Sequence, residues 1–167
     1  DEKQAEAAVQ TELDKLKNKD AAFVQKLATD LDTEFSASSG YSLSELGVDP
    51  AAFAQWLLAD FDYELDGAYT YSDGTGTVYA DVTMRDAYAF ASTFMTDAQA
   101  FANSVEAGSM DEAAVKAKLG ELFNAAMAKT ADMTDNYVSL DLTKKDGTWT
   151  VDEDSWADEV EYLFGTI

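Results

Sequence analysis

Apolar and polar residues alternate along two stretches of the chain, and each stretch predicts a β-hairpin. In the later stretch, residues 137–151, the turn residues Asp146-Gly147 separate two alternating runs, whose apolar positions are Val138, Leu140, Leu142, Trp149 and Val151. In the earlier stretch, residues 63–71 and 77–84 flank the turn residues Asp73-Gly74-Thr75-Gly76. Alternation with a period of two is typical of strands that bury one face.

Apolar residues recur every three or four positions elsewhere, which predicts amphipathic helices. The first covers residues 2–35 and is expected to break at Asn18-Lys19-Asp20, where Asp20 can cap the second part. Asp49-Pro50 is a helix start signal, since proline suits the first helical position. Ser42-Leu43-Ser44-Glu45 has the form of a capping box and predicts one short turn before it.

Three more helices are predicted in the second half of the chain. One spans residues 86–106, and the next follows the capping-box sequence Ser109-Met110-Asp111-Glu112. The apolar stripe expected on that second helix consists of Val115, Leu119, Leu122 and Ala126. The last begins near Asp154 or Ser155. Gly67-Ala68 interrupts the first strand and predicts a bulge there.

Together these elements predict an α+β fold, in which an antiparallel four-stranded curved sheet made of two β-hairpins packs against about five helices. No proline-rich or glycine-rich linker divides the chain, so we expect a single domain over residues 1–167. Residues 1–48 would supply the N-terminal helices and a loop. Residues 49–167 would supply the portion that carries the sheet.

Composition excludes several kinds of chemistry. The chain has no cysteine and no histidine, which removes thiolate nucleophiles, imidazole acid–base catalysis and metal sites built from either group. Acidic residues number 33 against 11 basic ones, a formal charge of −22, so phosphate backbones and anionic lipid headgroups are repelled. We therefore expect no nucleic-acid partner and no direct membrane insertion. Solubility explains such charge most simply; cation binding and a halophilic cytoplasm are the alternatives.

Two acidic runs raise the possibility of calcium binding, because Ca²⁺ takes oxygen ligands. They are Asp30, Asp32 and Glu34, and Asp152, Glu153, Asp154 and Asp158. Neither fits an EF-hand loop, since Phe35 or Ala157 stands where that loop needs glycine. We interpret the first run as a solvent-facing helix surface and the second as the cap of a helix N-terminus. No metal site and no cofactor are predicted.

The candidate ligand or partner surface is a set of residues that the alternation places away from the core. It comprises Tyr79, Tyr137 and Thr83 on the far face of the sheet and Tyr41 in a loop. The alternative is that a helix covers this face. An enzymatic alternative pairs Asp62 or Glu64 with Tyr69 or Tyr71, although the alternation does not direct these acids into an apolar pocket.

The closing segment, residues 138–152, combines two alternating strands, an Asp-Gly turn and Trp149, and leads into a helix that ends Tyr162-Leu163-Phe164-Gly165. With the elements from Asp49 onward, it resembles the small secreted lipoprotein domains of Gram-positive bacteria, which are similar to the cystatin-like and nuclear-transport-factor-like superfamily. The resemblance implies export, with a signal peptide and a lipid-bearing cysteine expected upstream of Asp1, outside this sequence. The expected location is the cell surface.

The function expected from these observations is that of an extracytoplasmic, non-enzymatic binding or interaction module, whose partner is an unknown small ligand or protein. A first alternative is a histidine-free enzyme of the isomerase or dehydratase type, with aspartate and tyrosine in a cleft. A second is a structural domain that associates with itself, for example as a homodimer through the free sheet face.

Overall fold

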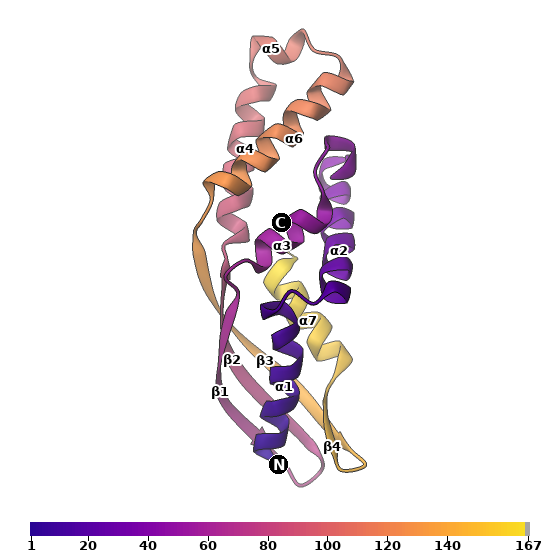
Figure 1. Cartoon of the computed structure of the whole chain (residues 1–167), viewed down its shortest axis with the longest axis vertical. Coiled ribbons are helices and arrows are strands. Elements are labelled where there is room, and N and C mark those ends of the chain that lie inside the picture. The colour runs from indigo at the N-terminus through magenta and orange to yellow at the C-terminus, as the bar shows by residue number, and fades with distance from the viewer. Residues whose placement is uncertain (166–167) are drawn as a thin grey trace.

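The computed structural model describes residues 1–165, so residues 166–167 of the predicted domain lie outside the described part. The helices are α1 (Glu2–Lys17), α2 (Ala21–Ser39), the 3₁₀ turn η1 (Ser44–Leu46), α3 (Pro50–Leu58), α4 (Ala87–Ala102), α5 (Val105–Gly108), α6 (Glu112–Lys129) and α7 (Glu153–Phe164). The strands are β1 (Asp62–Thr70), β2 (Thr75–Arg85), β3 (Met133–Lys145) and β4 (Thr148–Val151). Figure 1 shows the helical pair α4–α6 extending away from the sheet.

The predicted α+β class and the curved, four-stranded antiparallel sheet are confirmed. Strand order is β1-β2-β3-β4, so the two hairpins lie side by side and join through β2 and β3. The register of β1 against β2 shifts between Leu65 and Ala68, where Gly67 has φ 125°. This confirms the predicted bulge, which uses a conformation that favours glycine.

One face of the sheet, here called the inner face, carries the apolar residues. Its buried members in the two central strands are Val78, Ala80, Val82, Met84, Val138, Leu140 and Leu142. Helix α1 lies along this face (Figure 1) and buries Val9, Leu13 and Leu16. Because α1 contacts β1, β2 and β4, its apolar side closes the core over the width of the sheet.

Local capping signals place several helix boundaries as predicted. The Asp20 carboxylate accepts a hydrogen bond from the Phe23 N–H, which starts α2 after the break. Ser42 and Glu45 form the reciprocal bonds of a capping box at η1. The prediction for α6 is wrong in detail, because Asp111 rather than Ser109 caps the helix. Residues 86–106 also divide into α4 and α5 rather than forming one helix.

Phe123 of α6 is the centre of an aromatic cluster that joins the helical pair α4–α6 to the rest of the core. Its ring centroid lies 5.7 Å from that of Phe35, 4.9 Å from those of Phe53 and Phe90, and 5.2 Å from that of Phe94. The predicted stripe on this helix did not include Phe123, although the side chain is fully buried. Four helices therefore meet at one ring.

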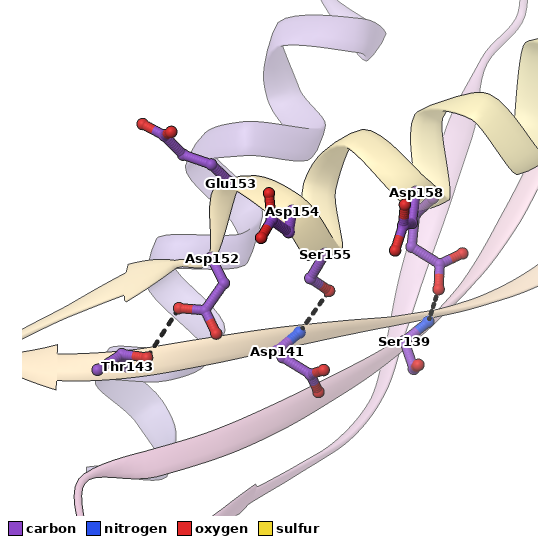
Figure 2. Close-up of a pocket in the computed structure, with 9 residues that line it drawn as sticks. Ser139, Asp141, Thr143, Asp152, Glu153, Asp154, Ser155 and Asp158 are labelled. Atoms are coloured by element: carbon purple, nitrogen blue, oxygen red, sulfur yellow. Dashed lines mark hydrogen bonds between the residues drawn. The ribbon is translucent and has the colours of Figure 1, made fainter.

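Helix α7 completes the edge of β3 where the short β4 ends. The Asp141 N–H donates to Ser155 Oγ at 2.9 Å, and its carbonyl oxygen accepts from the Asp152 N–H at 2.9 Å. The Ser139 N–H donates to Glu159 Oε1 at 3.5 Å. Figure 2 shows the contact between Asp141 and Ser155. Two side chains and one backbone N–H of this segment thus replace a neighbouring strand at Ser139 and Asp141.

The acidic run lies at the N-terminus of α7 as predicted, and Asp152 is the N-cap residue, but its side chain makes no hydrogen bond to the first turn. Its carboxylate instead accepts a hydrogen bond from Thr143 Oγ1 at 2.8 Å, which holds the segment that precedes the helix against β3. The nearby Glu159 side chain is partly buried, and this loss of hydration raises the pKa of its carboxyl group above the ordinary value. The charges of Asp158 and Asp141 raise that pKa further, whereas the bond from the Ser139 N–H lowers it.

We expect Phe123→Ala to lower the free energy of unfolding by about 3–5 kcal/mol, because it removes a buried ring and leaves a cavity that four neighbouring rings cannot fill. Chemical denaturation measures this change. Val105→Ala is the control, since Val105 is 94% exposed and its truncation should change the stability by less than about 0.5 kcal/mol. Equal effects of the two substitutions would contradict the central role of Phe123.

We expect Glu159→Gln to stabilise the protein at neutral pH by up to about 1 kcal/mol, the size of a solvent-screened charge interaction. Glutamine keeps an acceptor for the Ser139 N–H and removes the negative charge. The pKa of Glu159 is higher in the folded protein than in the unfolded chain, so the folded protein holds this proton more tightly. The free energy of unfolding therefore falls as the pH rises from the ordinary glutamate pKa through the raised folded-state pKa. The gain should disappear below about pH 4. Thermal unfolding at several pH values tests this, and a gain that persists in acid would contradict it.

Candidate functional site

Three tyrosines form a diagonal line across the outer face of the sheet, one from each of the first three strands. Tyr69 of β1 lies opposite Thr77, which precedes Tyr79 by two residues in β2. Tyr137 of β3 lies opposite Asp81, which follows Tyr79 by two residues. Diagonal neighbours on one face of a sheet are within reach of aromatic side chains. We call Tyr69, Tyr79 and Tyr137 the tyrosine row.

The rings of the tyrosine row contact one another and remain open to solvent. Tyr79 and Tyr137 are stacked, with centroids 5.7 Å apart and planes 16° apart, and Tyr69 meets Tyr79 edge-on at 5.9 Å. Tyr69 is 55% exposed and Tyr137 is 50% exposed. The row is therefore a partly fixed aromatic surface with little side-chain freedom left to lose on binding.

Carboxylates surround the tyrosine row. The Tyr137 hydroxyl donates to Asp66 Oδ2 at 3.0 Å, while Thr83 Oγ1 donates to Asp135 Oδ1 and Thr77 Oγ1 donates to Asp141 Oδ1, each at 2.9 Å. Within residues 1–165, none of these aspartates forms a salt bridge with a lysine or arginine. Partial loss of hydration and the bond to Asp66 raise the pKa of Tyr137, so its phenol stays a neutral donor. The outer face consequently carries uncompensated negative charge.

The structure brings together three of the four predicted surface residues. Tyr79, Tyr137 and Thr83 share the outer face, although the Thr83 hydroxyl is already engaged by Asp135. Tyr41 lies elsewhere, beside α6, where Lys116 Nζ is 5.6 Å from its ring centroid. The alternative that a helix covers the tyrosines is not what the structure shows, since Tyr69 and Tyr137 stay exposed.

Tyr69 and Asp66 belong to the site but were not predicted as part of it. Counting alternate residues from Tyr63 and Leu65 would place Tyr69 on the inner face with them. The bulge at Gly67 inserts one residue and reverses this count, so Ala68 packs inward and Tyr69 points outward. The glycine signal for the bulge was present in the sequence and, applied to the count, places Tyr69 outward; Asp66 precedes the bulge and is placed outward by the alternation itself.

An acidic hollow borders the tyrosine row where α7 passes β3 (Figure 2). It has a volume of about 720 Å³ and is lined by Ser139, Asp141, Thr143, Asp152, Glu153, Asp154, Ser155, Asp158 and Glu159. Ser139 pairs with Tyr79 across the strands, so hollow and row form one acidic surface. In the described part of the chain, no group of three or more acidic side chains is arranged to hold a metal ion.

A second hollow lies between α2 and α7 and differs in character. Its volume is about 410 Å³, and Phe23, Leu27, Leu31, Trp156, Val160 and Phe164 supply its apolar lining. Lys26, Asp30, Glu34 and Glu161 also line it. It is a shallow extension of the core between two helices.

In the described residues 1–165, two aspartate–tyrosine pairs are joined by hydrogen bonds, and neither lines a hollow described above. The Tyr63 hydroxyl donates to Asp14 Oδ1 at 2.6 Å, which ties β1 to α1. Burial, followed by the bond to Asp14, strongly raises the pKa of Tyr63, so the phenol remains protonated. The second pair is Tyr137 with Asp66 on the exposed face. Both phenols are held as hydrogen-bond donors rather than as proton acceptors. The pairs proposed for an enzyme, Asp62 or Glu64 with Tyr69 or Tyr71, are not among the hydrogen bonds, and Asp62 instead pairs with Lys17 at 3.0 Å.

Comparison with known proteins gives a likeness of fold. No protein-family model and no curated protein sequence matches the chain. Among solved structures, the crystal structure of YcdA from Bacillus subtilis, a proposed lipoprotein, matches with a TM-score of 0.52 and 17% sequence identity. The match covers 81% of this chain and 44% of the YcdA chain, so this chain spans less than half of that structure. The fold of this chain is thus similar to that of a proposed lipoprotein. The cystatin-like and nuclear-transport-factor-like assignment stays a prediction.

Proposed function

We propose that this chain is an extracytoplasmic, non-enzymatic interaction module that binds a positively charged polypeptide through the tyrosine row. The observation that carries the proposal is the exposed, stacked row itself, set among aspartates that form no salt bridge within residues 1–165. Exposed aromatic residues gathered on one face are typical of partner surfaces.

The chemistry of the outer face complements lysine and arginine. The faces of tyrosine rings attract cations, and nearby carboxylates add a charge-assisted hydrogen bond. Asp66, Asp135 and Asp141 lie around the row, and the acidic hollow extends the negative surface toward α7. A chain of net charge −22 also attracts basic partners over a distance, which raises the rate of association.

The proposed location rests on the likeness of fold to YcdA, described as a proposed lipoprotein. Surface lipoproteins are held by a lipid on an upstream cysteine, so the folded domain needs no membrane span of its own. Among the helices of residues 1–165, none is long and apolar enough to cross a membrane. An interaction domain displayed on a cell surface is compatible with these observations.

Self-association through the outer face is less favourable than binding of a basic partner there. A second copy would bring its own aspartates against Asp66, Asp81 and Asp135, and like charges placed opposite one another on a sheet are destabilising. A basic partner would relieve that repulsion. For this reason we commit to a partner that differs from the chain itself.

The test uses a short probe peptide in which lysine and threonine alternate, titrated into the isotope-labelled chain. We expect chemical-shift changes to concentrate at the tyrosine row, and we expect Tyr137→Ser and Tyr79→Ser each to weaken binding about fivefold to tenfold, as the truncation of an aromatic interface residue does. Affinity should also fall as salt rises.

Tyr162→Ser is the matched control, because Tyr162 is 54% exposed on α7 and lies outside the row. Its removal should leave the affinity unchanged within about twofold. Equal weakening by all three substitutions, or shift changes spread evenly over the acidic surface, would show unspecific attraction and would contradict the proposal. Absence of binding would contradict it as well.

A further inference from the structure

The two edges of the sheet are treated differently. At one edge, the α7 segment bonds the outward groups of β3 at two residues: Glu159 accepts from the Ser139 N–H, Ser155 accepts from the Asp141 N–H, and the Asp152 N–H donates to the Asp141 carbonyl. At the other edge, no strand among residues 1–165 pairs with the free side of β1. An unpaired strand edge presents a row of N–H and C=O groups that can pair with another chain.

The register identifies which groups of β1 point outward. The Tyr71 N–H donates to the Thr75 carbonyl at 2.9 Å, so the backbone groups of Tyr71 face β2. In an antiparallel pair, the residues whose N–H and C=O groups face the partner strand are every second one. The N–H and C=O groups of Thr70 and Ala68 therefore face away from β2. Beyond the bulge, the pairing with β2 places Leu65 and Tyr63 outward. Two observations agree with this count. First, the Tyr63 N–H donates to the Asp62 carboxylate and not to β2. Second, the same count continued from β1 across β2 to β3 predicts that the Asp141 N–H faces away from β2, and it does donate to Ser155 of α7.

The open part of the edge runs from Glu64 to Thr70. Upstream, Lys17 reaches from α1 to Asp62 and closes that end. Leu65, Ala68 and Thr70 form no outward hydrogen bond with any other residue of the described chain. Their N–H groups are therefore available as donors, at alternate positions of a strand long enough for several bonds.

The side chains of β1 specify what can lie beside it. Glu64, Asp66 and Tyr69 point to the outer face, whereas Leu65 and Ala68 are partly buried on the inner face. A neighbouring strand would place alternate residues opposite these acids, so basic side chains suit its outer positions and small or apolar ones its inner positions. A second copy of this chain would instead set acid against acid.

We propose that the polypeptide partner adds an extended basic segment to the free edge of β1, as a fifth strand whose outward side chains reach the tyrosine row. This inference rests on the function proposed above and deepens it by naming the mode of binding. Backbone bonds along β1 give the segment its direction and register. Asp66 and Tyr69 are residues of β1 whose side chains lie on the outer face beside the tyrosine row. They therefore connect the backbone contact along β1 with the side-chain contact at the tyrosine row.

The experiment compares the lysine–threonine probe peptide with two N-methylated forms, one methylated at every lysine amide and one at every threonine amide. In a strand added to β1, only one of these two sets of N–H groups faces the protein. We expect one form to bind like the parent peptide and the other about tenfold or more weakly, because it loses several backbone hydrogen bonds. Equal affinities of the two forms would overturn strand addition.

Amide hydrogen exchange on the unaltered chain gives an independent measurement. Binding of the parent peptide should slow exchange at Leu65, Ala68 and Thr70, which face outward, more than at Tyr69, which already faces β2. Thr70→Pro removes one outward donor without touching the bonds to β2 and should weaken binding, while Thr70→Val keeps the N–H and should not.

The outcomes separate the two proposals. Shift changes at the tyrosine row without slower exchange along β1 would overturn strand addition and leave the proposed function standing. Loss of all binding would remove both. If Thr70→Pro does not fold, the methylated peptides and the exchange measurement still decide.

Discussion

The pairing of β2 with β3 is the interaction on which the rest of this structure depends. Their register, from Thr75 opposite Thr143 to Arg85 opposite Met133, brings the buried apolar side chains of the pair to one face: Val78, Ala80, Val82, Met84, Val138, Leu140 and Leu142. A shift by one residue would turn these side chains to water. Helices α1 and α3 contact that face, so the opposite face receives the tyrosines, threonines and aspartates as a direct consequence of the same register.

Signals that act within a few residues made much of the fold predictable. Alternation predicted both hairpins, the glycine predicted the bulge, and Asp20 and Asp49 predicted helix starts. Tyr79 and Tyr137 were placed on the outer face by the same period. Contacts between distant segments were not predictable in this way. The bond of Tyr63 to Asp14, the four rings around Phe123 and the cover that α7 gives β3 all depend on how finished elements meet, and the role of Tyr69 was hidden by the bulge.

Some charged side chains of this protein form contacts that hold the fold together, and others lie on the surface without an ion-pair partner among residues 1–165. Many carboxylates accept hydrogen bonds close by, as Asp32 does from the Leu43 N–H at 2.7 Å, so acidity alone does not mark a site. The single arginine is also used internally: Arg85 donates to the Thr130 carbonyl and to Asp60 and lies 5.4 Å from the Trp56 ring centroid. Within residues 1–165, the salt bridges of lysine and arginine lie within helices or between elements, and none involves Asp66, Asp135 or Asp141 of the outer face.

Helix α7 follows β3 in the chain, and this order has a consequence for the folding of a chain that emerges from its N-terminus onward. The strand emerges before the segment that satisfies the Ser139 and Asp141 N–H groups. Until that segment arrives, β3 is open at these two residues while β1 is open along its free side, and neighbouring unfolded chains can pair through either strand. The acidic residues along both edges repel such neighbours, so the charge pattern protects the chain in the interval before its last helix docks.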